Sequence, residues 1–300
     1  MFNDLSVTRY LLRSPKIHES VTFAFLSDLH GAEFGPGNRR LLRAVDHYHP
    51  DAVLIGGDML VERYEDPLRV PIRLLRSLAG RYPVFAANGN HEHRLEYIPA
   101  EDAYPVFAEQ SAAGAEEAVR DQLNHEAGSE QISGPSLKYV YDRAVKKAGV
   151  QVLINESTVF EKGRTKVRIW GLDLEKEFFP RGKNIRMPEG VMDYYLGEKP
   201  EDACYDLLLA HHPNYLEEYA GWGADAVLSG HIHGGAVRLP GIGGLLSPNF
   251  TFFPRYSKGR YTKGTCDMII SAGLGTHSFK LRLNNLPDLV ILKLVRGEKR

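Results

Sequence analysis

Residues able to bind metal ions occur in five short motifs spread over the chain. Their side chains combine histidine nitrogens with carboxylate and amide oxygens. That mixture is the ligand set of Mn²⁺, iron, Zn²⁺ or Co²⁺, and it is too rich in nitrogen for a Ca²⁺ or Mg²⁺ site. The seven ligands are too many for one tetrahedral ion but suit two ions. In chain order the motifs are Asp28-x-His30, Gly57-Asp58, Gly89-Asn90-His91-Glu92, His211 and Gly230-His231-x-His233.

Each motif has an ordinary structural explanation when it is taken alone. Asp28 is the kind of residue that caps a helix, and Gly57-Asp58 is a common turn sequence. A lone histidine is more often a surface or core residue than a ligand. The ordered set is what indicates function, because five of the twelve histidines fall inside it.

Each of the first three motifs follows an apolar segment that reads as a buried strand. These predicted strands cover residues 21–27, 51–57 and 83–87, and apolar residues at helical spacing lie between them at 41–45 and 68–78. Alternating strands and helices predict a partly parallel sheet that is covered by helices. Ligands bind at the carboxyl edge of such a sheet, which is where the three motifs lie.

The second half of the chain is richer in predicted strands, and two of them again end in histidines, at His211 and at His231. We therefore expect an α/β fold in which two mixed sheets pack face to face with helices outside, as one domain over residues 1–300. The predicted strands of this half are 151–154, 166–172, 205–210, 224–228, 236–239, 266–271 and 288–295.

The ordered motifs resemble those of the calcineurin-like metallophosphoesterase superfamily. That family's pattern is D-x-H, G-D, G-N-H-[DE], H and G-H-x-H, and every part of it is present between residues 28 and 233. The stretches 234–240, 273–276, Arg282 and 286–287 look like a bacterial phosphodiesterase branch of the family. The resemblance implies a four-layer sandwich and a phosphoester hydrolase.

The resemblance also implies a role for each motif residue. Asp28, His30, Asp58 and His233 would hold one metal ion, and Asp58, Asn90, His211 and His231 would hold the second. Asp58 would bridge the two ions, because a carboxylate has two oxygens. His91 would lie outside the metal ligands and would stabilise the transition state or protonate the leaving oxygen.

The implied reaction is hydrolysis of a phosphoester, with a phosphodiester favoured, by a hydroxide that bridges two divalent or transition-metal ions. Mn²⁺ is the favoured ion, ahead of iron, Zn²⁺ and Co²⁺. Two alternatives on the same site are a phosphomonoesterase and a nucleotide pyrophosphatase, since the motifs build the metal site and the loops set specificity. An alternative from another class is a metal-free scaffold of the same fold that binds proteins.

Several further residues carry weaker expectations. Of the adjacent pair His211 and His212, we favour His211 as the ligand, with His212 capping a helix or supporting a ligand. Glu92 is interpreted equally as a residue that orients His91 or a ligand and as a solvated carboxylate at the end of a strand. Four residues are weak candidates for substrate binding: His93, Arg238, His277 and Arg282.

The composition of the chain indicates which partners the protein can have and where in the cell we expect it. The chain has 300 residues, 43% of them hydrophobic, and a net charge of −1, which excludes wholesale disorder and argues against a dedicated nucleic-acid binder. The two cysteines suit a reducing compartment. No apolar run is long enough to cross a membrane, and the start lacks the order of a signal peptide. We expect a cytoplasmic protein with a small phosphoester substrate, and peripheral membrane association is the alternative location.

One segment differs in charge from the rest. Residues 95–136 hold nine acidic residues and one basic residue, a net charge of −8 that leaves +7 for the remaining chain. The segment is rich in Ala, Glu and Gln, which predicts helices with a thin apolar face. We predict an acidic helical insertion within the domain, either a solvated excursion or a lid beside His91.

Overall fold

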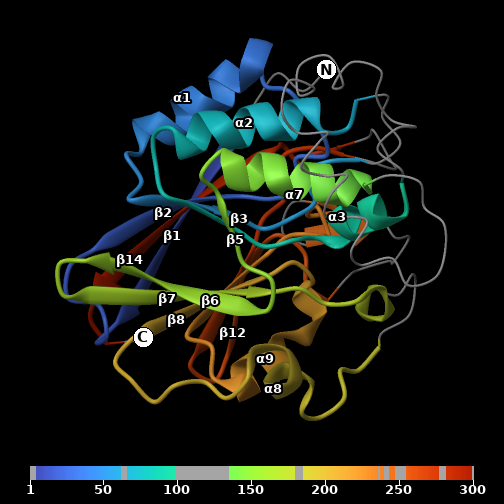
Figure 1. The fold of residues 1–300 in the computed structure, drawn as a ribbon. Coiled ribbons are helices and arrows are strands. Elements are labelled where there is room, and N and C mark those ends of the chain that lie inside the picture. The colour runs from blue at the N-terminus through green and yellow to red at the C-terminus, as the bar shows by residue number, and fades with distance from the viewer. Residues whose placement is uncertain are drawn as a thin grey trace.

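The computed structural model describes residues 5–61, 66–98, 135–179, 185–235, 237–239, 243–246, 255–276 and 282–298. Over these residues the chain forms two six-stranded sheets that pack face to face, with helices on both outer faces (Figure 1). This arrangement confirms the predicted α/β fold of two mixed sheets flanked by helices.

The first sheet contains the strands that precede the first three motifs. Strands β2 to β5 are parallel to one another, and β14 lies antiparallel beside β2 and parallel to β1. In sheet order the strands are β1 (Ser6–Ser14), β14 (Asp288–Arg296), β2 (Val21–Leu26), β3 (Ala52–Ile55), β4 (Val84–Ala86) and β5 (Gln151–Val152). All but β1 were predicted. β1 carries charged residues and buries few side chains, so it lacks the apolar pattern of the inner strands.

The second sheet carries the strands that precede the later histidine motifs. Its four central strands, β13, β9, β8 and β7, are parallel, and an antiparallel strand lies at each edge. In sheet order the strands are β12 (Gly259–Lys263), β13 (Cys266–Ile270), β9 (Ala226–Ser229), β8 (Tyr205–Ala210), β7 (Thr165–Leu172) and β6 (Glu156–Lys162). A separate antiparallel pair consists of β10 (Val237–Leu239) and β11 (Gly243–Leu246).

Two helix layers cover the sandwich. The layer on the first sheet consists of α1 (Arg39–His47), α2 (Arg69–Ala79) and α7 (Leu137–Lys147), and the layer on the second consists of α8 (Val191–Leu196) and α9 (Leu216–Trp222) (Figure 1). The short helix α3 (Asn90–Arg94) follows β4. Four 3₁₀ turns complete the described elements: η1 (Pro36–Asn38), η2 (Leu95–Tyr97), η3 (Lys176–Phe178) and η4 (Pro213–Tyr215).

Apolar packing explains why the inner strands are continuously hydrophobic. Along β3, Ala52 and Leu54 point into the core between the two sheets, whereas Val53 and Ile55 point into the core beneath the helices. Successive side chains of a strand alternate between faces, so a strand that is covered on both sides must be apolar throughout. The helices contribute one face each, as Leu75 of α2 does.

The ends of the acidic segment lie next to each other. The backbone N–H of Leu137 donates a hydrogen bond to the carbonyl of Ile98 at 2.8 Å, so the chain departs after η2 and returns at the start of α7. Residues 99–134 lie outside the described residues, and the helical insertion over 95–136 therefore stays a prediction. No helix in the described ranges is both long enough and apolar enough to cross a membrane.

Removal of a side chain from the core between the two sheets should lower the stability of the protein. We expect Leu54→Ala to lower the free energy of unfolding by about 2–5 kcal/mol, because Leu54 is fully buried and the change leaves a cavity. The matched control is Leu11→Ala on β1, where the leucine is 45% exposed and the loss should be about 0.5 kcal/mol or less. Urea denaturation of both variants measures the difference. Equal losses would show that the sheets do not pack as described.

Candidate metal centre

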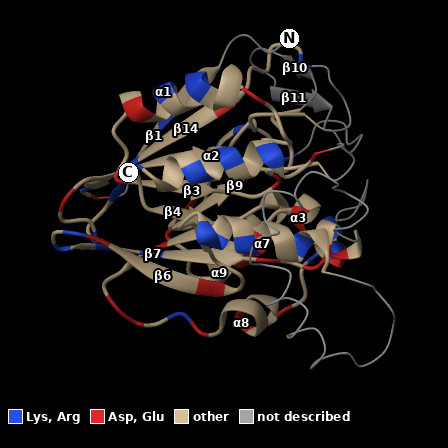
Figure 2. Ribbon diagram, turned by 45° about the horizontal axis from the view of Figure 1, so that its top comes forward, with Lys and Arg blue, Asp and Glu red and all other residues tan. Residues whose placement is uncertain are grey.

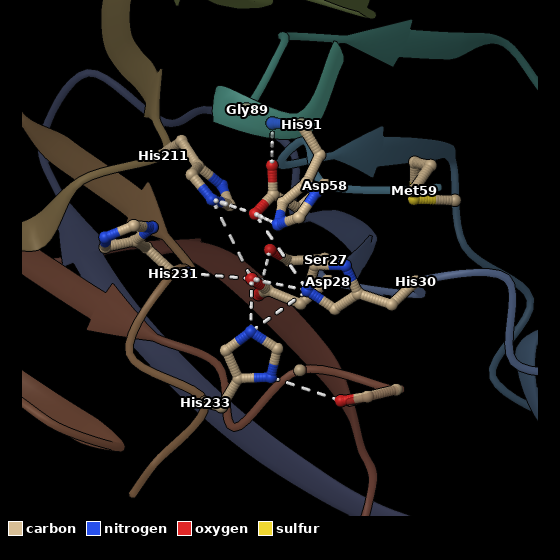
Figure 3. Close-up of polar contacts among 12 residues, drawn as sticks. Ser27, Asp28, His30, Asp58, Met59, Gly89, His91, His211, His231 and His233 are labelled. Atoms are coloured by element: carbon tan, nitrogen blue, oxygen red, sulfur yellow. Dashed lines mark hydrogen bonds and ion pairs between the residues drawn. The ribbon is translucent and has the colours of Figure 1, made fainter. Parts of the chain in front are cut away.

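The predicted ligands meet at one edge of the sandwich because they follow parallel strands of both sheets. Asp28 and His30 come after β2, and Asp58 comes after β3. The residues from the second sheet come after β8 and β9, whose carboxyl ends lie at the same edge. Figure 3 shows Asp28, Asp58 and His30 converging with the side chains of His211 and His233, while the ring of His231 lies beside them.

The ligand atoms form three overlapping groups, each within 4.8 Å and each made of buried residues: Asp28, His30 and His233; His30, Asp58 and His91; and Asp58, His211 and His231. His30 and Asp58 each belong to two groups. The structure therefore brings six of the seven predicted ligands together, with His91 beside them. The seventh, Asn90, is the first residue of α3 and immediately precedes His91.

Backbone carbonyls orient three of the imidazole rings. The Nδ1 atoms of His30, His211 and His233 lie 3.2, 2.6 and 3.1 Å from the carbonyl oxygens of Leu60, Gly56 and Gly275 respectively. A carbonyl oxygen can only accept, so each Nδ1 carries the proton of its ring. In the neutral ring the Nε2 atom then presents a lone pair to the centre, which is the usual arrangement of a metal-binding histidine.

These oriented atoms crowd electron-rich groups against one another. The Nε2 atoms of His30 and His233 lie only 3.0 Å apart, and Asp28 Oδ1 is 3.3 Å from Nε2 of His233. Asn90 Oδ1 is also buried and makes no hydrogen bond with any described residue. A cation among these atoms would turn their mutual repulsion into attraction, so the residues fit one or more divalent metal ions.

Burial and neighbouring charges set the protonation of the groups at this site. Burial holds the pKa values of His30 and His231 well below the usual range, so both rings are neutral. Burial alone would raise the pKa of Asp58, but the neighbouring His211 and His91 hold it well below the usual range. Burial lowers the pKa of His211, but the charges of Asp58 and Asp28 and the hydrogen bonds to Asp58 and the Gly56 carbonyl together raise it to about 10. A carboxylate facing these imidazoles is a suitable place for a cation.

The backbone is strained at the ligand positions. Nine non-glycine residues of the described chain have positive φ, and five of these are predicted ligands: Asp28 (52°), His30 (47°), Asp58 (54°), His231 (68°) and His233 (53°). Such conformations are uncommon for side chains with a Cβ and persist only where surrounding structure enforces them. Tight strand-end turns thus aim the side chains inward at an energetic cost.

Two motif glycines allow neighbouring ligand loops to approach each other closely. A Cβ atom at Gly89 would lie 2.3 Å from Asp58 Oδ1, and one at Gly230 would lie 2.3 Å from Asp28 Oδ2. Both distances are far below van der Waals contact. Any larger residue would push a predicted ligand carboxylate out of position, so these glycines are needed for the shape of the site.

Glu92 fastens two of the ligand loops together. Its carboxylate accepts backbone N–H bonds from Asp58 at 2.9 Å, Met59 at 2.8 Å and Gly89 at 2.8 Å, and its side chain is buried. Of the two interpretations that the sequence leaves open, the solvated carboxylate is wrong. The signal in the sequence is its place three residues after Gly89, where a carboxylate can reach back to the start of a helix.

A second supporting group was missed by the sequence analysis. Asp173 follows β7, and its carboxylate contacts His93 Nε2 at 2.5 Å and accepts a hydrogen bond from Asn88 Nδ2 at 2.9 Å. The hydrogen bond with Asp173 raises the pKa of His93. The position of Asp173 directly after a predicted strand could have identified it as a site residue.

Ser27 is a further supporting residue, since its hydroxyl donates a hydrogen bond to Asp28 Oδ2 at 2.6 Å. Nothing in the sequence around Ser27 indicates this role.

The remaining weak candidates have different surroundings. His212 Nδ1 accepts the backbone N–H of Asn214 at 3.3 Å at the start of η4, which confirms its predicted capping role. Arg282 donates to the carbonyl oxygens of Ala272, at 2.9 Å, and of Gly275, and burial lowers the pKa of Arg282 to about 10.

Two candidates for substrate binding have no described side chain. Arg238 lies in β10, but its side chain falls outside the described part of the structure. His277 lies outside the described residues altogether. A role in substrate binding stays a prediction for these two residues, as it does for His93 and Arg282.

Comparisons with known proteins agree on one family. The family model described as calcineurin-like phosphoesterase matches residues 21–235, which is more than half of the chain. Phosphodiesterase YaeI of Escherichia coli (strain K12) is 26% identical over 278 residues, 90% of this chain and 81% of that protein. The metallophosphoesterase YkuE of Bacillus subtilis (strain 168) is 29% identical over 93 residues, 31% of this chain and 32% of its own. The phosphopantetheinyl hydrolase PptH from Mycobacterium tuberculosis aligns with 83% of this chain and 88% of that chain at a TM-score of 0.43 and 15% identity.

The close approach at Gly89 gives a direct test of the centre. We expect Gly89→Ala to weaken Mn²⁺ binding by about 10–100-fold, because the added methyl group displaces Asp58. The matched control is Gly221→Ala in α9, where a Cβ meets no atom within 4 Å and binding should be unchanged. Isothermal titration of the metal-free proteins with Mn²⁺ measures both affinities. Wild-type affinity in Gly89→Ala would contradict the geometry of the site.

Proposed function

Because this chain belongs to the calcineurin-like phosphoesterase family and is a metal-dependent phosphoesterase, we propose that it hydrolyses phosphodiesters at a centre of two metal ions. The observation that carries the proposal is the position of Asp58. Its ligand oxygen lies within reach of both flanking groups, one containing His30 and the other containing His211 and His231. A carboxylate shared in this way is the usual bridge of a two-metal site.

The proposed ligands divide between the two ions. Asp28, His30, Asp58 and His233 would hold the first ion, and Asp58, Asn90, His211 and His231 would hold the second. The distances from Asp58 Oδ2 support this division, since the Nε2 atoms of His211 and His30 lie 3.1 and 3.9 Å away. The buried amide oxygen of Asn90 completes the second set.

The chemistry of the donor atoms narrows the choice of metal. Imidazole nitrogens mixed with carboxylate and amide oxygens suit Mn²⁺, iron, Zn²⁺ or Co²⁺, and we propose Mn²⁺ as the preferred ion. When bound, such ions lower the pKa of water and neutralise charge on phosphoryl oxygens. The protein's part is to hold the ligands rigidly and to exclude bulk water from them, which the burial of all three ligand groups supports.

His91 is the proposed acid of the reaction. Its ring is buried, with Nε2 at 4.0 Å from Asp58 Oδ2, and its backbone N–H donates to Asp58 Oδ1 at 2.8 Å. The main chain therefore ties His91 to the carboxylate between the two metal positions. From there the imidazole can donate a proton from Nε2 to the leaving oxygen of the ester, or stabilise the charge that develops on the phosphoryl group.

The preference for diesters is supported by the name of a relative. The Escherichia coli protein that matches 90% of this chain is called a phosphodiesterase. A panel of small phosphodiesters, phosphomonoesters and nucleotide pyrophosphates, each assayed with Mn²⁺, Zn²⁺ and Mg²⁺, tests the preference. We expect the highest kcat/KM for a diester with Mn²⁺. A higher kcat/KM for a monoester or a pyrophosphate would contradict it.

Replacement of His91 should separate catalysis from metal binding. We expect His91→Ala to keep its bound metal but to lose about 10²–10⁴-fold in kcat, the usual contribution of a positioned general acid. The control is His47→Ala, which removes an exposed histidine of α1. Elemental analysis and the rate of diester hydrolysis measure the two properties. If His91→Ala hydrolysed the diester at the wild-type rate, the proposed role would be wrong.

Removal of the bridging carboxylate should empty both positions. We expect Asp58→Ala to bind neither ion stably, since each set of ligands loses its shared oxygen. The control is Asp193→Ala, which removes an exposed carboxylate of α8. Elemental analysis after gel filtration measures the metal content, and circular dichroism verifies the fold. Two ions retained by Asp58→Ala would contradict the bridging role.

A further inference from the structure

The helix layer on the first sheet is strongly basic. Helices α1, α2 and α7 together contain ten basic and two acidic residues. Figure 2 shows the arginine and lysine segments of the three helices on one side of the molecule. The apolar faces of the same helices are buried against the sheet, so the basic residues gather on the outer side. We call the exposed arginines and lysines of these three helices the basic face.

Most charges of the basic face are not neutralised locally. Six exposed side chains form no ion pair with any described residue: Arg39, Arg43, Arg73, Arg76, Lys146 and Lys147. The two acidic residues of the helices are already engaged, Asp46 with Arg81 at 2.5 Å and Asp142 with Lys138 at 2.5 Å. The face therefore carries a net positive field toward solvent.

The opposite helix layer has the reverse charge. Helices α8 and α9 contain three acidic residues, Asp193, Glu217 and Glu218, and no basic residue. Glu217 pairs with Arg255 at 2.9 Å and with Lys263 at 3.7 Å, so the acidic character of this layer is weaker than the basic character of the other. The sandwich thus has a basic helix layer on one side and an acidic one on the other. An extended anionic plane would orient such a molecule, because it attracts one face and repels the opposite face.

We infer that the basic face is a docking surface for a membrane that contains anionic lipids. Three helices lie side by side in one layer there, which gives a broad surface rather than a groove (Figure 1). Juxtamembrane arginines and lysines each contribute about 1 kcal/mol of attraction to an anionic leaflet. The attachment is electrostatic, since the apolar faces of these helices are buried in the core and cannot enter the lipid.

The composition of the face favours a membrane over a nucleic acid. Proteins that bind single strands combine basic grooves with aromatic stacking platforms. Among the exposed large apolar side chains of the described residues, the three helices contribute Tyr139 alone, and the guanidinium of Arg143 lies 5.6 Å from its ring. The face offers distributed positive charge without stacking rings.

Docking on this face would not cover the edge of the sandwich where the predicted metal ligands lie. The ligands lie at the carboxyl ends of the strands, at the edge of the sandwich where α3 begins, and not on the outer side of α1, α2 and α7 (Figure 1). Membrane attachment and hydrolysis can therefore be measured independently.

Vesicle binding by the full chain tests the inference. We expect the protein to co-sediment with vesicles of phosphatidylcholine and about one third phosphatidylglycerol at low salt, but not with phosphatidylcholine alone. About 0.5 M salt should release it, because the Debye length then falls to a few ångströms. The variant R43Q/R73Q/R76Q should lose on the order of 100-fold in partition coefficient, about fivefold for each charge.

A second variant with the same change in net charge tests whether vesicle binding depends on the basic face or only on the total charge of the protein. R164Q/K166Q/K263Q removes three exposed basic residues, one from the turn between β6 and β7 and two from strands β7 and β12 of the second sheet, and should bind like the wild type. Both variants should hydrolyse a small water-soluble diester at the wild-type rate, which verifies their folding and separates this test from that of the activity. Equal losses in the two variants, or no preference for anionic vesicles, would overturn the inference. Binding to duplex DNA at the same salt with no binding to vesicles would overturn it in favour of a nucleic acid.

Discussion

The inferred metal centre depends on one close contact. The Nε2 atoms of His30 and His233 lie 3.0 Å apart. Each ring is held from behind by a carbonyl that accepts from its Nδ1, so each presents a lone pair to the other. Two lone pairs beside the carboxylate of Asp28 repel one another in a buried site. Only a positive charge makes the arrangement favourable, and the donor set selects a divalent metal ion.

Several features of the surrounding structure hold these histidine and carboxylate side chains close together. Parallel strands of two sheets bring their carboxyl ends to one edge, and the residues that follow adopt positive φ values that aim the proposed ligands inward. Gly89 and Gly230 let the loops touch, and Glu92 accepts three N–H groups to fasten the β3 and β4 loops together. Strain at the ligands is offset by the three apolar cores, which hold the strands rigidly.

The parts that could be predicted from the sequence are those with strong local signals. The inner strands β2, β3 and β4 are apolar on both faces, so their pattern is continuous, and the metal-ligand types stand out at their ends. The strands β1, β6 and β12 were missed because they expose charged side chains. Asp173 follows a predicted strand as the other site residues do, but it belongs to none of the five motifs, and its partner His93 was identified only when the fold placed the two 2.5 Å apart.

The separation of charge between the two helix layers also depends on the whole fold. The net charge of −1 conceals a basic layer on the first sheet and an acidic layer on the second, and no local motif reports this. The same sandwich thereby presents a metal centre at its edge and a charged surface on its side. These two features use different residues and can act independently.

Anomalous diffraction from crystals grown with Mn²⁺ would locate the metal ions and show whether Asp58 lies between two of them. We expect two manganese peaks per chain, one among Asp28, His30 and His233 and one beside His211, His231 and Asn90, with the carboxylate of Asp58 between them. A single peak at this centre, or a second peak that lies away from Asp58, would contradict it.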